Sequence, residues 1–222
     1  MRTDCQERFS NYLYLQRVAP KTHKSYLYYV KGLSAYFQQP ADELTNDQIQ
    51  DYLLHCIQKK KMAWVSCNVL FCSLKKFYQG FLGRDKTGFS IPPRPRSHQL
   101  PMLLSREEVG SILKATGNLK HLALLTLIYG SGLRVSEAVR LQAEHIDSKK
   151  MLIRVDQSKG RKDRYTVLSK HSLELLRDYW RAYKPGKWLF FSGDKNKPMP
   201  PETASKIYYL AKQKAGVTKG RG

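Results

Sequence analysis

Residues 129–138 read Tyr-Gly-Ser-Gly-Leu-Arg-Val-Ser-Glu-Ala and follow the stretch Leu-Lys-His-Leu-Ala-Leu-Leu-Thr-Leu-Ile at 119–128. The earlier stretch is apolar almost all round, which is typical of a helix at the centre of a domain. Two glycines then let the chain turn sharply, and a new helix is expected to begin near Arg134. A guanidinium at a helix start suits a phosphate oxygen, and Glu137, one turn further on, is placed to orient it.

A second basic motif follows at residues 158–164, Ser-Lys-Gly-Arg-Lys-Asp-Arg. Alternating stretches at 151–155 and 165–168 flank it, which predicts two strands joined by a basic turn. Such a hairpin can enter a DNA groove and carry a lysine to a leaving oxygen. Taken singly, each motif has an ordinary interpretation: a solvated charged turn here, and a helix break with a surface ion pair at Arg134 and Glu137.

Helices surround this hairpin in the C-terminal half of the chain. Ser105 and Glu108 form the pattern of a capping box, which predicts a helix after them. Further helices are expected at 169–183 and 201–215. A hairpin set among helices predicts an α+β unit with a small β-hairpin sheet.

The N-terminal part of the chain, residues 1–83, predicts only helices. Apolar residues recur at helical spacing in three stretches, 26–37, 49–57 and 64–81. Another helix is expected near residues 4–17, and Thr45 with Gln48 forms a second capping box. The regular period of the aromatic residues favours a core over a platform for stacking bases. We expect a four-helix bundle, in a chain whose fold class is mainly α.

A segment rich in proline and basic residues, 84–101, separates these parts. Proline cannot continue a helix, so the segment predicts an extended basic linker. The expected organisation is therefore a helical unit at 1–83, the linker at 84–101 and a second unit at 102–222.

Positive charge dominates both parts of the chain. There are 39 Lys+Arg against 18 Asp+Glu, a formal net charge of +21. Residues 1–98 hold 15 basic and 7 acidic side chains, and residues 99–222 hold 24 and 11. Charge on two folded units suggests a clamp around nucleic acid whose affinity falls as salt rises. A generic basic surface, as in proteins that bind ribosomes or acidic lipids, is the alternative.

Composition excludes several other classes of protein. The hydrophobic content of 41% is too high for a disordered basic tail. No stretch approaches the ~20 apolar residues of a membrane span, and the N-terminus lacks the apolar region of a signal peptide. The cysteines show no paired C-x-x-C spacing, and Cys67 and Cys72 fall in an apolar helical pattern. We therefore expect reduced thiols, no metal and a cytoplasmic protein that does not act at a membrane.

Taken together, the motifs resemble those of the tyrosine recombinases of the phage integrase superfamily, in its Xer-like and integron-integrase-like branches. The segments that carry the resemblance are Thr22 with Tyr26, Leu-Lys-Lys-Phe-Tyr-Gln-Gly-Phe at 74–81, Leu-Pro-Met-Leu-Leu-Ser-Arg-Glu-Glu-Val at 100–109, Gly-Leu-Arg-Val-Ser-Glu at 132–137 and Lys-Gly-Arg-Lys-Asp-Arg at 159–164. The resemblance covers essentially the whole chain. It implies a SAM-like core-binding domain, a catalytic domain, double-stranded DNA as partner and a homo-oligomer on DNA, tetrameric in the family's synapse.

The resemblance also implies the role of three residues in site-specific DNA recombination and integration. Arg134 corresponds to the first catalytic arginine, which binds the scissile phosphate. Lys159 corresponds to the hairpin lysine that protonates the departing 5′ oxygen, and Glu137 to the acidic residue that supports the active site. Cationic donors stabilise phosphoryl transfer, and a covalent protein–DNA bond conserves the phosphodiester energy, so no cofactor is expected.

Other basic residues are candidates for contact with the DNA backbone. The candidates are Arg161, Lys162 and Arg164 in the hairpin, and Lys24, Lys31, Lys75 and Lys76 in the helical part. Lys162 is also a second, less favoured choice for the lysine role. For the four lysines of the helical part, a solvated face explains the pattern equally well.

The family mechanism also uses a His-x-x-Arg box, a further His or Trp and a nucleophilic Tyr. None of the six histidines is followed by arginine at the third position, and Tyr208 and Tyr209 look like ordinary helix residues. The stretch 215–222 resembles the sequence that directly precedes the missing box. We therefore expect a truncated recombinase with no nucleophile in this chain, which binds DNA, lacks autonomous cleavage and exposes apolar surface on its second domain.

Two other functions fit the same patterns. A non-catalytic DNA-binding module would occupy recombination sites or modulate a full-length recombinase by forming mixed oligomers. A basic RNA-binding helical protein would show no preference for a duplex with inverted half-sites. Motifs alone do not distinguish integration, excision and dimer resolution, in a mobile genetic element or elsewhere.

Overall fold

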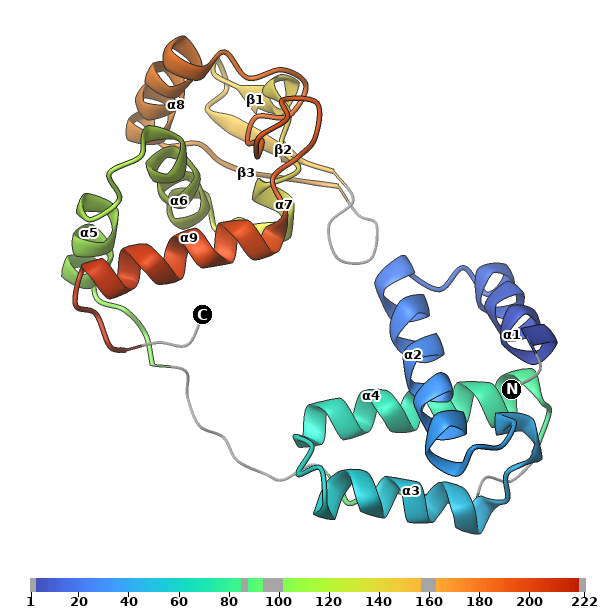
Figure 1. Cartoon of the computed structure of the whole chain (residues 1–222). Helices are drawn as coiled ribbons and strands as arrows, with labels where there is room; N and C mark the ends of the chain where they lie inside the picture. The colour runs from blue at the N-terminus through green and yellow to red at the C-terminus, as the bar shows by residue number, and fades with distance from the viewer. Residues whose placement is uncertain (1–2, 85–87, 94–101, 157–162, 220–222) are drawn as a thin grey trace. The chain divides into compact units, whose positions relative to one another are not determined.

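The computed structural model describes residues 3–84, 88–93, 102–156 and 163–219 (Figure 1). Helices dominate these residues, with one small sheet, which confirms the mainly α fold class. The chain divides into two compact units, Met1–His98 and Gln99–Gly222. The expected linker and the tip of the expected hairpin lie largely outside the described residues.

Helices build the first unit. Its described elements are α1 (Thr3–Leu15), α2 (Pro20–Phe37), the 3-10 turn η1 (Ala41–Glu43), α3 (Asn46–Gln58), α4 (Trp64–Lys75) and the π-helical segment η2 (Lys76–Phe81). Helix α3 begins at the expected capping box. The Thr45 hydroxyl accepts the Gln48 N–H at 3.2 Å, and Gln48 Oε1 accepts the Thr45 N–H at 2.9 Å. This reciprocal pair satisfies two N–H groups that a helix start leaves open.

Apolar side chains of the four α-helices in the first unit meet in one core. Phe9 of α1, Leu33 of α2, Ile49 of α3 and Leu70 of α4 are fully buried. Phe77 of η2 packs edge-on against Phe9, with ring centroids 5.0 Å apart. The aromatic stripe therefore supplies the core, as its period predicts, and the expected helical bundle is confirmed.

The middle of the expected linker packs against this first unit. Phe89 is 3% exposed and contacts the rings of Phe71 and Tyr78, with centroids 5.9 Å away in each case. The indole of Trp64 donates to the carbonyl of Pro92 at 3.0 Å. Burying a phenyl ring stabilises by about 2 kcal/mol, which favours packing over an extended course in water. This part of the segment therefore extends the helical unit.

Around a central helix, the second unit combines helices with a small sheet. Its described elements are α5 (Arg106–Lys114), α6 (Leu119–Ser131), α7 (Val135–Ala138), η3 (Ala143–His145), β1 (Ile146–Asp147), β2 (Leu152–Val155), β3 (Arg164–Val167), α8 (Lys170–Tyr183) and α9 (Pro201–Lys214). Leu124 and Leu127 of α6 are fully buried, and α6 packs on both α8 and α9 (Figure 1). The sequence-based prediction of a buried central helix is thus confirmed. Helix α5 begins at the expected capping box of Ser105 and Glu108.

The sheet is antiparallel, in the order β1-β2-β3. Strands β2 and β3 form the expected hairpin, whose register ends at the pair Val155↔Arg164. Strand β2 begins at Leu152 because Met151 takes a left-handed backbone with φ of 54°. Strand β1 has two residues, too few to show a strand period in the sequence.

Helix α7 is shorter than the sequence predicts, since it makes one turn only. Beyond it, the carbonyl of Leu141 accepts the Leu189 N–H at 2.8 Å, and Gln142 pairs with Trp188 in an antiparallel bridge. These pairings draw the chain out of the helix. Because peptide dipoles add along a helix, a single turn gives Arg134 little of the expected dipole support.

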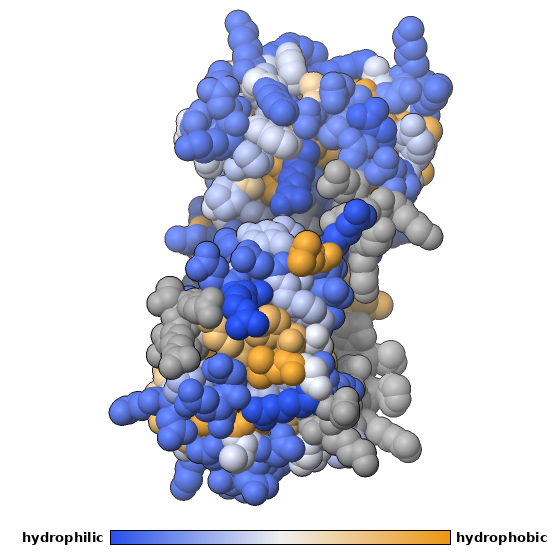
Figure 2. Space-filling model, turned by 90° about the vertical axis from the view of Figure 1, so that its right-hand side faces the viewer, coloured by the Kyte–Doolittle hydropathy of each residue, from blue (hydrophilic) through white to orange (hydrophobic). Residues whose placement is uncertain are grey.

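Hydrophilic residues cover most of the molecular face in Figure 2, and hydrophobic residues are exposed over smaller areas. The four cysteines are free thiols, and burial raises the pKa of Cys56 and Cys67. Among the residues that the structure describes, none of the helices has both the length and the apolar character needed to cross a membrane. The same residues include no group of three His, Cys, Asp or Glu side chains arranged to hold a metal ion.

Candidate active site

Two glycines at the end of α6 set the course of the chain into the site. Gly132 has φ of 60°, and its N–H donates to the carbonyl of Ile128, so it ends the helix in the left-handed conformation that glycine adopts at little cost. A Cβ added at Gly130 would lie 3.2 Å from Ser172 Oγ, at the start of α8. Glycine therefore allows α6 and α8 to approach closely. The turn leaves Arg134 as the residue that precedes α7.

Hydrogen bonds join Arg134 to Glu137. Arg134 Nη1 donates to Glu137 Oε1 at 2.7 Å, and the Arg134 backbone N–H donates to Oε2 at 2.9 Å. The Glu137 side chain is 7% exposed, whereas that of Arg134 is 55% exposed. The carboxylate is therefore fixed inside the unit while the guanidinium reaches the surface. This is the orienting contact that the spacing of the two residues predicts.

A second arginine shares the same carboxylate. Arg164, the first residue of β3, donates from Nη2 to Glu137 Oε2 at 2.6 Å, and its side chain is 34% exposed. Sequence reasoning expects Arg164 at the DNA backbone and misses this partner inside the protein. The strand period could have indicated it: Arg164 shares a face with Thr166, whose hydroxyl donates to the Ser131 carbonyl at 2.7 Å, while Tyr165 between them is exposed.

The residue that follows β2 is bound by His145 of η3, a histidine that the sequence analysis did not single out. His145 is 6% exposed, and its Nδ1 accepts the Gln142 N–H at 3.2 Å. That bond assigns the ring proton to Nε2, which lies 3.1 Å from Asp156 Oδ2. Arg154 Nε donates to the other oxygen of Asp156 at 2.9 Å. The last described residue before the hairpin tip is therefore anchored to η3.

The expected lysine of the site, Lys159, lies outside the described residues, as do Arg161 and Lys162. The structure brings together Arg134 and Glu137 and adds Arg164 to them. Its described residues fix both ends of the hairpin tip, Asp156 on one side and Arg164 on the other.

Three candidate lysines of the first unit are exposed: Lys24, Lys31 and Lys75. Lys24 and Lys31 stand seven residues apart on α2 and so share one helix face. Lys31 borders an open groove of about 540 Å³, which is also lined by Lys60 and by the exposed ring of Tyr28. The groove thus combines aromatic rings with ammonium groups.

Lys76 differs from these three lysines because it has partners within its own unit. Its Nζ lies 3.4 Å from Gln16 Oε1, just after α1, and 5.2 Å from the centroid of the Tyr12 ring on α1. These contacts tie η2 to α1. A role in stabilising the first unit therefore accounts for Lys76 without a DNA contact.

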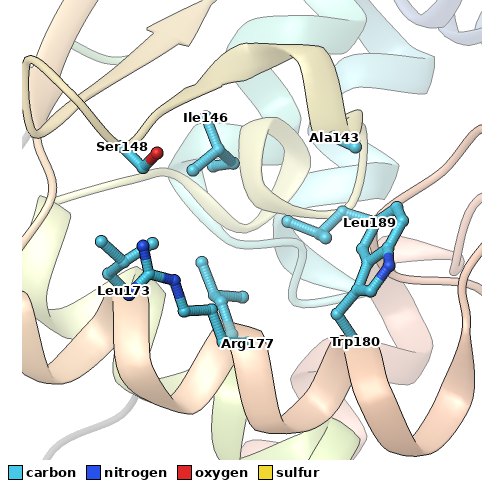
Figure 3. Close-up of a pocket in the computed structure, with 8 residues that line it drawn as sticks. Ala143, Ile146, Ser148, Leu173, Arg177, Trp180 and Leu189 are labelled. Atoms are coloured by element: carbon cyan, nitrogen blue, oxygen red, sulfur yellow. The ribbon is translucent and has the colours of Figure 1, made fainter.

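A pocket of about 270 Å³ lies between α8 and the segment around β1 (Figure 3). Its lining is mostly apolar and includes Ile146, Leu173 and Trp180, with Arg177 and Ser148 as its polar side chains. Among the residues that the structure describes, no carboxylate or imidazole lines this pocket, so they offer no acid–base pair there. The candidate active site is instead at Arg134.

Two family models together match almost the full length of the chain. The model of the phage integrase family matches residues 102–221, and the model of the phage integrase N-terminal SAM-like domain matches residues 6–87. The two matches coincide with the two kinds of unit that the structure shows.

Individual relatives agree with these models. The y4qK protein of Sinorhizobium fredii, an integrase/recombinase by name, is 39% identical over 85% of this chain and 61% of its own length. Tyrosine recombinase XerA of Pyrococcus horikoshii is 30% identical over 95% of this chain and 72% of its own length. The chain thus spans about six tenths of y4qK and about seven tenths of XerA.

A solved structure shows the same fold. It is that of a lambda integrase tetramer bound to a Holliday junction, with a TM-score of 0.71 at 16% sequence identity, covering 97% of this chain and 65% of that chain. The SAM-like bundle and the helical unit with its small sheet therefore have the lambda integrase fold. On the family models and the identity to relatives, the chain belongs to the phage integrase family of tyrosine recombinases.

Proposed function

We propose that this protein binds double-stranded DNA and acts in site-specific recombination, with Arg134 as the ligand of the phosphate at the cleavage site. The observation that carries the proposal is the guanidinium of Arg134, which is exposed at the surface and oriented by the buried carboxylate of Glu137. Planar guanidinium donors match the oxygens of a phosphodiester.

In the proposed reaction, strand cleavage and rejoining proceed by phosphoryl transfer at that phosphate. Arg134 stabilises negative charge that develops on the oxygens not involved in bond making, and Glu137 holds the guanidinium in place. Lys159 at the hairpin tip protonates the departing 5′ oxygen. Arg161 and Lys162, next to it in the sequence, contact the DNA backbone. These roles need no cofactor or metal.

Both units contribute to DNA binding in this proposal. Net charges of about +8 on residues 1–98 and about +13 on residues 99–222 favour contact with phosphates on each. Lys24, Lys31 and Lys75 are exposed and belong to the first unit's contribution. The groove beside Lys31, with its exposed Tyr28, is a surface that suits a nucleic-acid backbone.

Oligomerisation on DNA is part of the proposal. Solved relatives of the same fold include the lambda integrase tetramer bound to a Holliday junction and XerH bound to its difH substrate. By that likeness, several copies of this protein assemble on paired sites. Action on DNA places the protein in the cytoplasm, with the chromosome or mobile element that it recombines.

The proposal separates binding from cleavage for this chain of 222 residues. It holds Arg134, Glu137 and Lys159, but no His-x-x-Arg pattern and no tyrosine that we assign as nucleophile. Arg134 and Lys159 can support phosphoryl transfer, but without a nucleophile no covalent bond between protein and DNA can form. We therefore expect the purified chain to bind duplex DNA and to form no covalent adduct.

A nicked suicide duplex that traps the covalent intermediate tests both parts. Fluorescence anisotropy is expected to show binding to the duplex that weakens steeply with salt, and weaker binding to an RNA duplex of the same sequence. Denaturing gels are expected to show no protein–DNA adduct. Equal affinity for the RNA would contradict the choice of DNA, and a covalent adduct would contradict the absence of a nucleophile.

A further inference from the structure

We propose that Arg164 is a positioning residue of this site. Paired with Glu137, it anchors the start of β3 to the carboxylate that orients Arg134 and keeps the site positively charged. The proposal deepens the proposed function and rests on it for the phosphate that Arg134 binds. The contacts of Arg164 with Glu137 and Val155 do not depend on that function.

The position of Arg164 in the hairpin is the first argument. It pairs with Val155 at the last position of the β2–β3 register, and Lys159 lies between these two residues in the sequence. The Arg164–Glu137 bond of 2.6 Å joins that position to α7. Two residues further on, Thr166 is bonded to the end of α6. Strand β3 is therefore fixed to both elements that flank Arg134.

A matching anchor holds the other end of the tip. Asp156 lies next to Val155 and pairs with the buried ring of His145, with 3.1 Å between Nε2 and Oδ2. Asp156 and Arg164, on either side of residues 157–162, thus each pair with a buried side chain of the unit, His145 and Glu137.

Charge is the second argument. A buried carboxylate is costly unless cations and hydrogen bonds compensate it, and Glu137 is 7% exposed. If Arg134 alone compensated it, the pair would be neutral and would attract a phosphate weakly. The formal charges of Arg134, Arg164 and Glu137 sum to about +1. Arg164 therefore helps to compensate the carboxylate of Glu137, so that the positive charge of Arg134 is available to a phosphate.

A double-mutant cycle on the full chain tests the anchor. Arg164→Gln is expected to raise the unfolding equilibrium constant by about tenfold or more, because it leaves a buried carboxylate less compensated. In the Glu137→Gln background, Arg164→Gln is expected to raise the unfolding equilibrium constant less than about threefold. In the wild-type background, Arg164→Lys should raise it less than Arg164→Gln does. Arg181→Gln is the matched control, since Arg181 pairs with the exposed carboxylate of Asp178 within α8, and its loss should raise the unfolding constant at most about fivefold.

Nitrogen-15 NMR of the guanidinium groups provides a readout that loss of stability would not produce. Signals are assigned by their loss in Arg164→Lys and Arg134→Lys. We expect Arg164 to show slow rotation of its guanidinium before DNA is added and little shift on saturation with duplex, whereas the Arg134 signal shifts. The Glu137→Gln variant should free the rotation of Arg164.

The two measurements also separate this proposal from the proposed function. Additive effects in the cycle, or an Arg164 signal that shifts with DNA as much as that of Arg134, would overturn the positioning role in favour of a direct backbone contact. If the chain binds no duplex, the proposed function fails while the coupling of Arg164 to Glu137 is still measured.

Discussion

At the scale of single residues, the site depends on how one carboxylate is shared. Glu137 receives hydrogen bonds from the guanidinium groups of Arg134 and Arg164 and from the backbone N–H of Arg134. Only Arg134 combines this support with a side chain more than half exposed. Arg164 therefore completes the internal pair, and in the proposed function the exposed Arg134 meets the phosphate.

Gly132 gives a direct test of how the site is positioned. Its φ of 60° is strained for any residue with a Cβ, so Gly132→Ala is expected to destabilise the second unit by about 1 kcal/mol. Gly110→Ala is the matched control, because Gly110 lies within α5 with open space around it. Alanine there should stabilise by about 0.5–1 kcal/mol. Urea unfolding measures both, and equal effects of the two changes would contradict the role of the left-handed turn.

The sequence alone points to the pair Arg134 and Glu137, because residues three positions apart on a helix are neighbours in space. It misses the Arg164 partnership because that contact joins residues 27 positions apart. The pairing depends on how β3 packs on α6 and α7, which local patterns do not encode. His145 is missed for the same reason, since its acidic partner lies across the sheet.

At the scale of elements, local signals and tertiary pairings compete. Capping boxes at Thr45 and Ser105 start helices where the sequence predicts them, because both partners lie within four residues. Helix α7 ends early because Leu141 and Gln142 pair with a distant segment. Element starts are therefore predicted better here than the end of α7.

The segment after η2 offers a test at this scale. Phe89→Ala is expected to destabilise the first unit by about 3 kcal/mol, because the ring is 3% exposed and packs on Phe71 and Tyr78. Tyr165→Ala is the control, an aromatic side chain 66% exposed on the second unit, and it should change stability little. Hydrogen exchange of peptides from α4, followed by mass spectrometry, locates the effect. Unchanged exchange in α4 would show that Phe89 belongs to a linker instead.

At the scale of the whole molecule, two units of the same family architecture share the positive charge. The SAM-like match at residues 6–87 and the phage integrase match at 102–221 leave a short stretch between them. The order of motifs along the chain predicts this architecture because each motif is local. The net charge of +21 predicts a polyanionic partner, but it does not say which basic side chains have partners inside the protein, as Lys76 does.

The proposed contact of Arg134 with a DNA phosphate can be measured through the salt dependence of duplex affinity. For Arg134→Gln we expect weaker binding and a slope of log K against log salt that is shallower by about 0.9, the value for one lost phosphate contact. The control, Arg181→Gln, removes an exposed arginine of α8 that pairs with Asp178, and it should change the slope less. The shallower slope should therefore be specific to Arg134→Gln. Identical affinity and slope for wild type and Arg134→Gln would contradict it.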